Sequence, residues 1–124
     1  MATIYRVQHR IDGRGPYRPG ISELWSDPDG PDWPDIITEF GVDWRNEIPK
    51  GWWSGCAFLS LADLLTWFLP TERQKLKRIG FQPVEMEADT IIRRGKMQII
   101  FARRLPLSRD YTRLTWPQAQ RLAA

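Results

Sequence analysis

Alternation of apolar and polar residues predicts four short strands. Residues 3–8 and 81–88 alternate with the period of two that is typical of a half-buried strand. Residues 55–59 and 97–103 are short, mostly apolar runs of the length of a buried strand. The polar stretch 90–96 between the last two strands ends near a glycine and is interpreted as a connection. Four such strands predict a small, mostly antiparallel sheet.

Two helices are predicted between the second and third strands. In residues 60–69 four apolar side chains follow the spacing of one helical stripe: Leu61, Leu64, Leu65 and Phe68. Ser60 is well suited to cap the first turn, and Pro70 ends the pattern. A second helix is predicted over residues 71–79, and residues 105–114 are interpreted as a loop. We therefore expect an α+β fold with two short helices packed on the sheet.

Residues 21–53, named here the acidic segment, follow neither a helical nor a strand period. The segment holds five of the seven tryptophans, namely Trp25, Trp33, Trp44, Trp52 and Trp53, together with four prolines. Disordered segments are poor in aromatic residues, so we interpret it as an ordered excursion held by indole side chains. With this excursion, the chain is expected to form a single domain over residues 1–124.

Cysteine and histidine usage excludes several kinds of site. Cys56 is the only cysteine and His9 the only histidine, so no disulfide and no zinc-like ligand set is expected. The N-terminus lacks a signal-peptide pattern, and the apolar stretch 56–69 is too short and too polar to span a bilayer. These features predict no metal, no membrane contact and a location in the cytoplasm of a host cell.

The net charge of +3 conceals an uneven distribution. Eight acidic residues lie between positions 21 and 50, against only Arg45 and Lys50, while the rest of the chain is basic. Acids interleaved with aromatics repel phosphates, so direct nucleic-acid binding is not expected. They suit a protein partner with a basic surface, and the expected contact residues are Asp27, Asp29, Asp32, Trp33, Asp35, Asp43 and Trp44. The alternative is that this stretch is only a solvated loop.

Three short motifs resemble those of ADP-ribosyltransferases of the Arg–Ser–Glu type. They are Tyr5-Arg6 on the first strand, Phe58-Leu59-Ser60 at the end of a middle strand, and Glu85-Met86-Glu87 on a later strand. The order and the element types are similar to that family, although its Ser-Thr-Ser triplet is Leu59-Ser60-Leu61 here. The resemblance implies an ADP-ribosyltransferase-like fold and NAD as the cofactor of an enzymatic version.

The same resemblance implies catalytic roles for four residues. Arg6 would hold the NAD pyrophosphate, Ser60 would orient Arg6 and the ribose, and Glu87 would stabilise the oxocarbenium-like ribose. Glu85 would help to activate the acceptor. Each residue also has a structural alternative: Ser60 as a helix cap, the glutamates as solvent-facing strand residues, and Arg6 as an exposed strand arginine.

A second pattern looks like small phage and prophage proteins. It comprises residues 5–7, 15–17, 58–68 and 76–81. Small phage proteins of this size include anti-CRISPR inhibitors, at least one type of which is similar to ADP-ribosyltransferases. The resemblance implies a phage accessory protein that binds and inhibits a host protein complex. The alternatives are an NAD-dependent ADP-ribosyltransferase that modifies a host protein, and a small virion or assembly protein.

Overall fold

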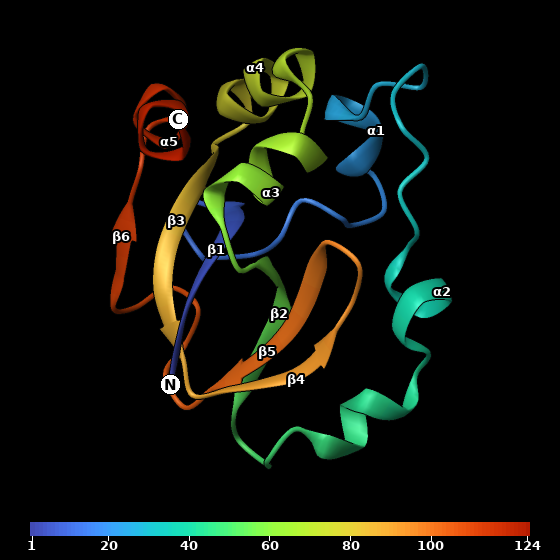
Figure 1. Ribbon diagram of the computed structural model, residues 1–124, viewed down its shortest axis with the longest axis vertical. Coiled ribbons are helices and arrows are strands. Elements are labelled where there is room, and N and C mark those ends of the chain that lie inside the picture. Colours follow the sequence, from blue (N-terminus) through green and yellow to red (C-terminus); the bar gives the residue numbers. More distant parts are fainter.

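A computed structural model describes residues 1–124 (Figure 1). Its strands are β1 (Ala2–His9), β2 (Trp53–Phe58), β3 (Phe81–Ala88), β4 (Thr90–Arg94), β5 (Gln98–Arg103) and β6 (Tyr111–Arg113). Its α-helices are α1 (Ser22–Trp25), α2 (Ile36–Phe40), α3 (Leu61–Trp67), α4 (Pro70–Arg78) and α5 (Trp116–Ala123), and η1 (Asp43–Glu47) is a 3-10 helix. None of the helices combines the length and the apolar character that a membrane crossing requires.

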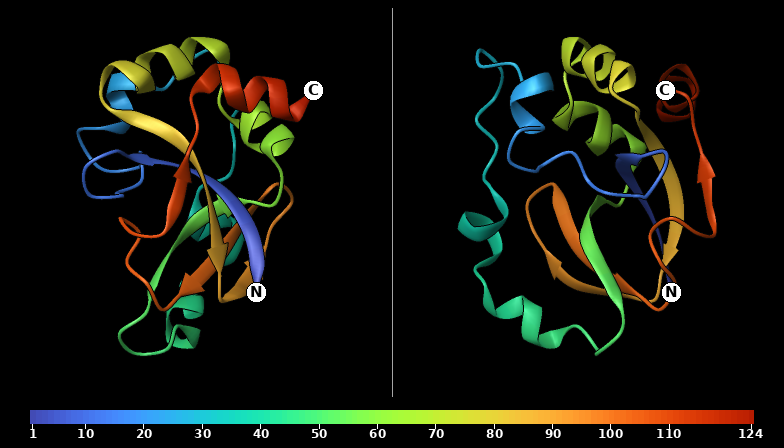
Figure 2. Two further views of the ribbon diagram at one scale, coloured as in Figure 1. Left: turned by 90° about the vertical axis from the view of Figure 1, so that its left-hand side faces the viewer. Right: turned by 180° about the vertical axis from the view of Figure 1, so that it is seen from behind.

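The six strands form one sheet in the order β4-β5-β2-β1-β3-β6, and every neighbouring pair is antiparallel. Strands β1 and β3 pair along their whole length, and so do β2 and β5. Strands β1 and β2 pair only at Tyr5↔Phe58 and diverge from that point (Figure 2). The sheet therefore consists of two three-stranded halves that are joined at a single register position.

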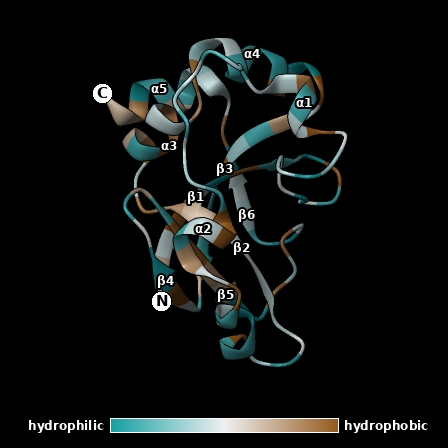
Figure 3. Ribbon diagram, turned by 90° about the vertical axis from the view of Figure 1, so that its right-hand side faces the viewer, coloured by the Kyte–Doolittle hydropathy of each residue, from teal (hydrophilic) through white to brown (hydrophobic).

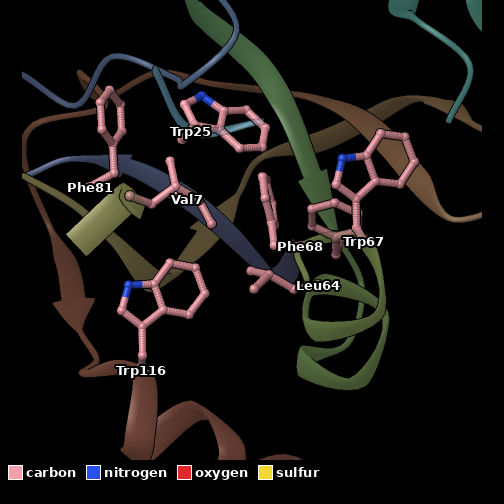
Figure 4. Packing of buried hydrophobic residues seen from close by; sticks show 9 residues of the cluster. Val7, Trp25, Leu64, Trp67, Phe68, Phe81 and Trp116 are labelled. Carbon is pink, nitrogen blue, oxygen red and sulfur yellow. The ribbon is translucent and has the colours of Figure 1, made fainter. Parts of the chain in front are cut away.

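One face of the sheet carries the larger core. Val7, Phe58 and Phe81, from three different strands, pack against side chains of α3, α4 and α5. The aromatic rings of Trp25, Trp67, Phe68 and Trp116 gather over this face (Figure 4). Because side chains alternate along a strand, Tyr5 and the residue paired with it, Glu85, belong to the same face as Val7.

The opposite face carries a second cluster built from the other half of the alternation. Its buried members are Ile4, Ala57, Val84, Met86, Ala88, Ile99 and Phe101. Leu107, from the loop between β5 and β6, and Tyr111, from β6, pack against it. Arg6 also belongs to this face, since it lies between Tyr5 and Val7 along β1.

The structure confirms the four predicted strands and adds two. Strands β1, β2, β3 and β5 match the predicted ranges to within two residues at each end. The prediction of a connection over residues 90–96 is wrong, because Thr90–Arg94 forms the edge strand β4. A register shift between Ile91 and Arg93 interrupts the alternation there, so the sequence shows no regular period. Strand β6 is too short to give a pattern.

The two predicted helices are present, with one change at their junction. Pro70 stands in the first turn of α4, where its missing N–H costs nothing, and α3 has already ended at Trp67. Glu72 completes a capping arrangement by accepting the N–H of Leu69 at 2.9 Å. The acidic segment also contains short helices, α1, α2 and η1, which lie along one side of the molecule (Figure 1).

Candidate functional site

The acidic segment is tied to the rest of the protein at several points along its length. Near its start, Glu72 of α4 accepts the N–H of Asp27 at 2.9 Å. Further on, the side chain of Gln98 donates to the carbonyl of Pro34 at 3.4 Å. Towards its end, Glu47 forms an ion pair with Arg93 of β4. The segment thus runs as a strap from the helices to the β4–β5 hairpin (Figure 3).

Three indole groups of the acidic segment fix its backbone by packing and by hydrogen bonds. Trp25 is buried and donates its N–H to the carbonyl of Pro16 at 3.0 Å. Trp33 stacks on Trp67, with ring centroids 5.0 Å apart, and donates to the Trp67 carbonyl at 3.0 Å. Trp44 is buried and donates to Gly41 at 2.9 Å. The expected contact residues Trp33 and Trp44 therefore serve first to fix the segment.

Several carboxylates of the acidic segment are exposed to solvent. Asp29, Asp32, Asp35 and Asp43 are exposed, and Asp27 is half-buried. None of these five forms an ion pair. Asp35 caps α2 by accepting the N–H of Thr38 at 2.7 Å, and this hydrogen bond lowers its pKa. The structure thus leaves a row of carboxylates without cationic partners on one outer surface.

Exposed apolar side chains accompany these carboxylates. Ile37 of α2 is 60% exposed, and Val42, just before η1, is 55% exposed. They lie in the chain between Asp35 and Asp43, which are both exposed. An apolar centre with a charged surround is the usual composition of a protein-binding surface. The sequence gives no signal for these two residues, because the exposure of a side chain cannot be predicted within a segment that follows no regular period.

Arg6 has a different environment from the one expected of a strand arginine. It is 4% exposed, forms no ion pair, and lies 5.6 Å from the centre of the Phe101 ring. Its hydrogen bond to the carbonyl of Gly13 is long, at 3.5 Å, and its Nε and Nη1 have no partner. Burial lowers its pKa to about 10, so it remains protonated at neutral pH.

A pocket of about 640 Å³ extends from Arg6 to the acidic segment. Its lining comes from the loop after β1, from the start of the acidic segment, from β2 and from α3. Six aromatic residues contribute to it: Tyr17, Trp25, Trp33, Phe58, Trp67 and Phe68. The Cys56 thiol also lines it, and burial raises the pKa of this thiol to about 11. Cys56 is thus an uncharged thiol at neutral pH and a poor nucleophile.

The structure does not bring the four candidate catalytic residues together. The Tyr5 hydroxyl donates to Glu85 at 3.0 Å, and Thr3 donates to Glu87, which places both glutamates on the face of β1 opposite Arg6. Ser60 caps α3 by accepting the N–H of Asp63 at 3.1 Å. Arg6 and Glu87 thus project from opposite faces of the sheet, and neither Ser60 nor the two glutamates line the pocket at Arg6.

The sequence matches the family described as Bacteriophage T4 Y00F protein over residues 1–112. The chain belongs to this family. Its membership supports the expectation of a phage accessory protein. No curated protein and no solved structure matches the chain. The resemblances to ADP-ribosyltransferases and to anti-CRISPR inhibitors therefore rest on the short motifs alone.

The region shared with this phage family contains both features described above. Residues 1–112 include the whole acidic segment and every residue that lines the pocket at Arg6. Helix α5 lies outside the matched region, although its Trp116 is part of the larger core.

Proposed function

We propose that this phage protein binds a host protein with a basic surface through the outer side of its acidic segment, and thereby inhibits the complex that the host protein forms. The observation that carries the proposal is the row of exposed, unpaired carboxylates at Asp29, Asp32, Asp35 and Asp43. A surface of one charge speeds encounter with a partner of the opposite charge and disfavours partners of the same charge.

The anchoring of the acidic segment supports the proposal. A segment that must order itself on binding loses affinity to the entropy of that ordering. Here Trp25, Trp33 and Trp44 already fix the backbone by packing and by hydrogen bonds to carbonyls. The carboxylates are therefore presented in one arrangement before the partner arrives.

The exposed apolar residues of the acidic segment would contribute affinity that its charges alone do not provide. Charged rims mainly set association rate and selectivity, whereas buried apolar contacts contribute much of the affinity. Ile37 and Val42, exposed between acidic neighbours, are suited to the centre of such a contact.

The test compares two variants that change the net charge equally. Asp29→Asn, Asp32→Asn and Asp35→Asn together remove three negative charges, and asparagine at position 35 still caps α2. The control variant adds three positive charges on exposed residues elsewhere, by Gln74→Lys, Ser108→Lys and Gln120→Lys. Each protein is used to isolate partners from a bacterial lysate, and the affinity for the recovered partner is then measured by calorimetry at low and high salt.

We expect the asparagine variant to lose about tenfold or more in affinity and most of its salt dependence. The control variant should bind within about threefold of the original protein, because it leaves the acidic segment unchanged. Equal affinity of the two variants, or binding by the original protein that salt does not weaken, would rule out this surface as the contact.

A further inference from the structure

The guanidinium of Arg6 is a buried cation without a counter-ion. Arg6 forms no ion pair, and its one hydrogen bond is a long one to the carbonyl of Gly13. Its Nε and Nη1 are shielded from solvent and have no acceptor. An unpaired buried charge is strongly unfavourable, so a negatively charged group placed beside this guanidinium would be stabilised by it.

The groups around Arg6 supply no negative charge. Cys56 is an uncharged thiol at neutral pH, and Arg103, which also affects Arg6, is a second cation. The surrounding chain instead makes room for the guanidinium. Gly55 on β2 has no side chain, and a Cβ placed there would lie 3.3 Å from Arg6 Cζ. The backbone at this point is thus built around a cation that the protein itself does not neutralise.

The pocket that reaches Arg6 has aromatic walls. Its volume of about 640 Å³ is in the usual range of small-molecule sites. The indole N–H groups of Trp25 and Trp33 are already used by backbone carbonyls. These side chains therefore contribute apolar surface to the pocket rather than hydrogen-bond donors, which suits an apolar ligand body.

Carboxylates in the lining of the pocket limit the charge that a ligand can carry. Asp27, Asp32, Asp35 and Glu72 line it, and none forms an ion pair. They would repel the further charges of a polyphosphate, whereas a single oxyanion at Arg6 would meet a guanidinium that has no counter-ion.

From these four observations we propose that the pocket binds a small aromatic molecule with one negative charge. Its oxyanion pairs with Arg6, and its ring lies among Tyr17, Trp25 and Trp33. Asp32 and Asp35 line this pocket as well as belonging to the partner surface proposed above, whereas Arg6 is buried and takes no part in that surface.

The test uses two fluorescent probes that differ only in charge. 8-Anilino-1-naphthalenesulfonate is an aromatic monoanion, and N-phenyl-1-naphthylamine is the same body without the sulfonate. The variant Arg6→Met removes the charge and keeps a long side chain, while Arg121→Met removes an exposed arginine of α5 as the matched control. Near-ultraviolet circular dichroism establishes that each variant is folded, because partly unfolded proteins also bind the anionic probe.

We expect the original protein to bind one anionic probe per chain, at least about tenfold more tightly than the neutral probe. Arg6→Met should reduce affinity for the anion by about tenfold or more and change affinity for the neutral probe less than about twofold. Arg121→Met should change neither. If Arg6→Met does not fold, Arg6→Lys, which keeps the charge, should retain the preference for the anion.

Nuclear magnetic resonance locates the probe. The indole N–H signals of Trp25 and Trp33, which line the pocket, should shift on binding, while that of Trp116, which does not, should stay unchanged. Equal affinity for the two probes in the original protein, or a shift confined to Trp116, would overturn the proposal. Failure of the probe test would not bear on the partner surface, because Arg6→Met leaves all carboxylates of that surface in place.

Discussion

At the scale of single residues, Arg6 and Gly55 show how one position constrains another across the sheet. Arg6 comes from β1 and Gly55 from β2, and the guanidinium lies where a side chain at Gly55 would be. Glycine normally weakens a strand, because it has no side chain to pack and loses more chain entropy on folding. Its presence in β2 is explained by the space that Arg6 needs.

Gly55→Ala is therefore expected to destabilise the protein by about 1–3 kcal/mol, the usual effect of forcing extra volume into a packed site. In an Arg6→Ala background the same change should be neutral or stabilising by about 0.5–1 kcal/mol, since alanine is the better strand and chain residue once the clash is gone. Urea denaturation of the four proteins measures this. Equal effects in the two backgrounds would mean that Arg6 is not the obstacle.

At the scale of elements, the short helices depend on their first turns. Helix α3 has seven residues, too few for intrinsic propensity alone to hold it. Ser60 satisfies one of its free N–H groups, and the buried Leu61, Leu64 and Trp67 fix it to the sheet. The hydroxyl of Ser60 thus has a structural role as the cap of α3, and this role explains its presence without any part in catalysis.

Ser60→Ala is expected to lower the free energy of unfolding by about 1 kcal/mol, while Ser60→Asp, which still caps a helix, should lower it by less than about 0.5 kcal/mol. Chemical denaturation followed by circular dichroism measures both. An aspartate variant that is as unstable as the alanine variant would show that the hydroxyl acts by something other than capping.

At the scale of the whole molecule, segments far apart in the chain complete one core. The ring centroids of Trp116, from α5, and Phe68, which follows α3, lie 6.5 Å apart. Both side chains belong to the same cluster as Val7 of β1. The C-terminal helix is therefore part of the folded unit, although the family match ends at residue 112.

Trp116→Ala is expected to destabilise the protein by about 3–5 kcal/mol, as for other large aromatic residues removed from a core. Leu122→Ala on the same helix should change stability by less than about 0.5 kcal/mol, since Leu122 is 66% exposed. Thermal unfolding of the two variants distinguishes these outcomes. Similar losses in both would indicate that α5 contributes through its helix rather than through the Trp116 side chain.

Local patterns in the sequence were enough to predict part of the fold. Four strands and the helices α3 and α4 followed from the spacing of apolar residues, because each pattern is repeated over five or more positions. The strand β4 was missed because its bulge breaks the period, and β6 because it spans only Tyr111–Arg113. The short helices of the acidic segment have only four or five residues each, too few to show a helical period.

The candidate site likewise has some features that the sequence shows and others that only the tertiary structure decides. The acidic character of residues 21–50 and the presence of tryptophans within it are properties of the sequence itself. Which carboxylates are unpaired, and which indoles are used as anchors, depends on groups brought in from α3, α4, β4 and β5. Alternation alone put Arg6 and Val7 on opposite sides of β1. Only the divergence of β1 and β2, with Gly55 beneath the guanidinium, made Arg6 a buried cation beside a pocket, because burial is set by residues distant in the chain.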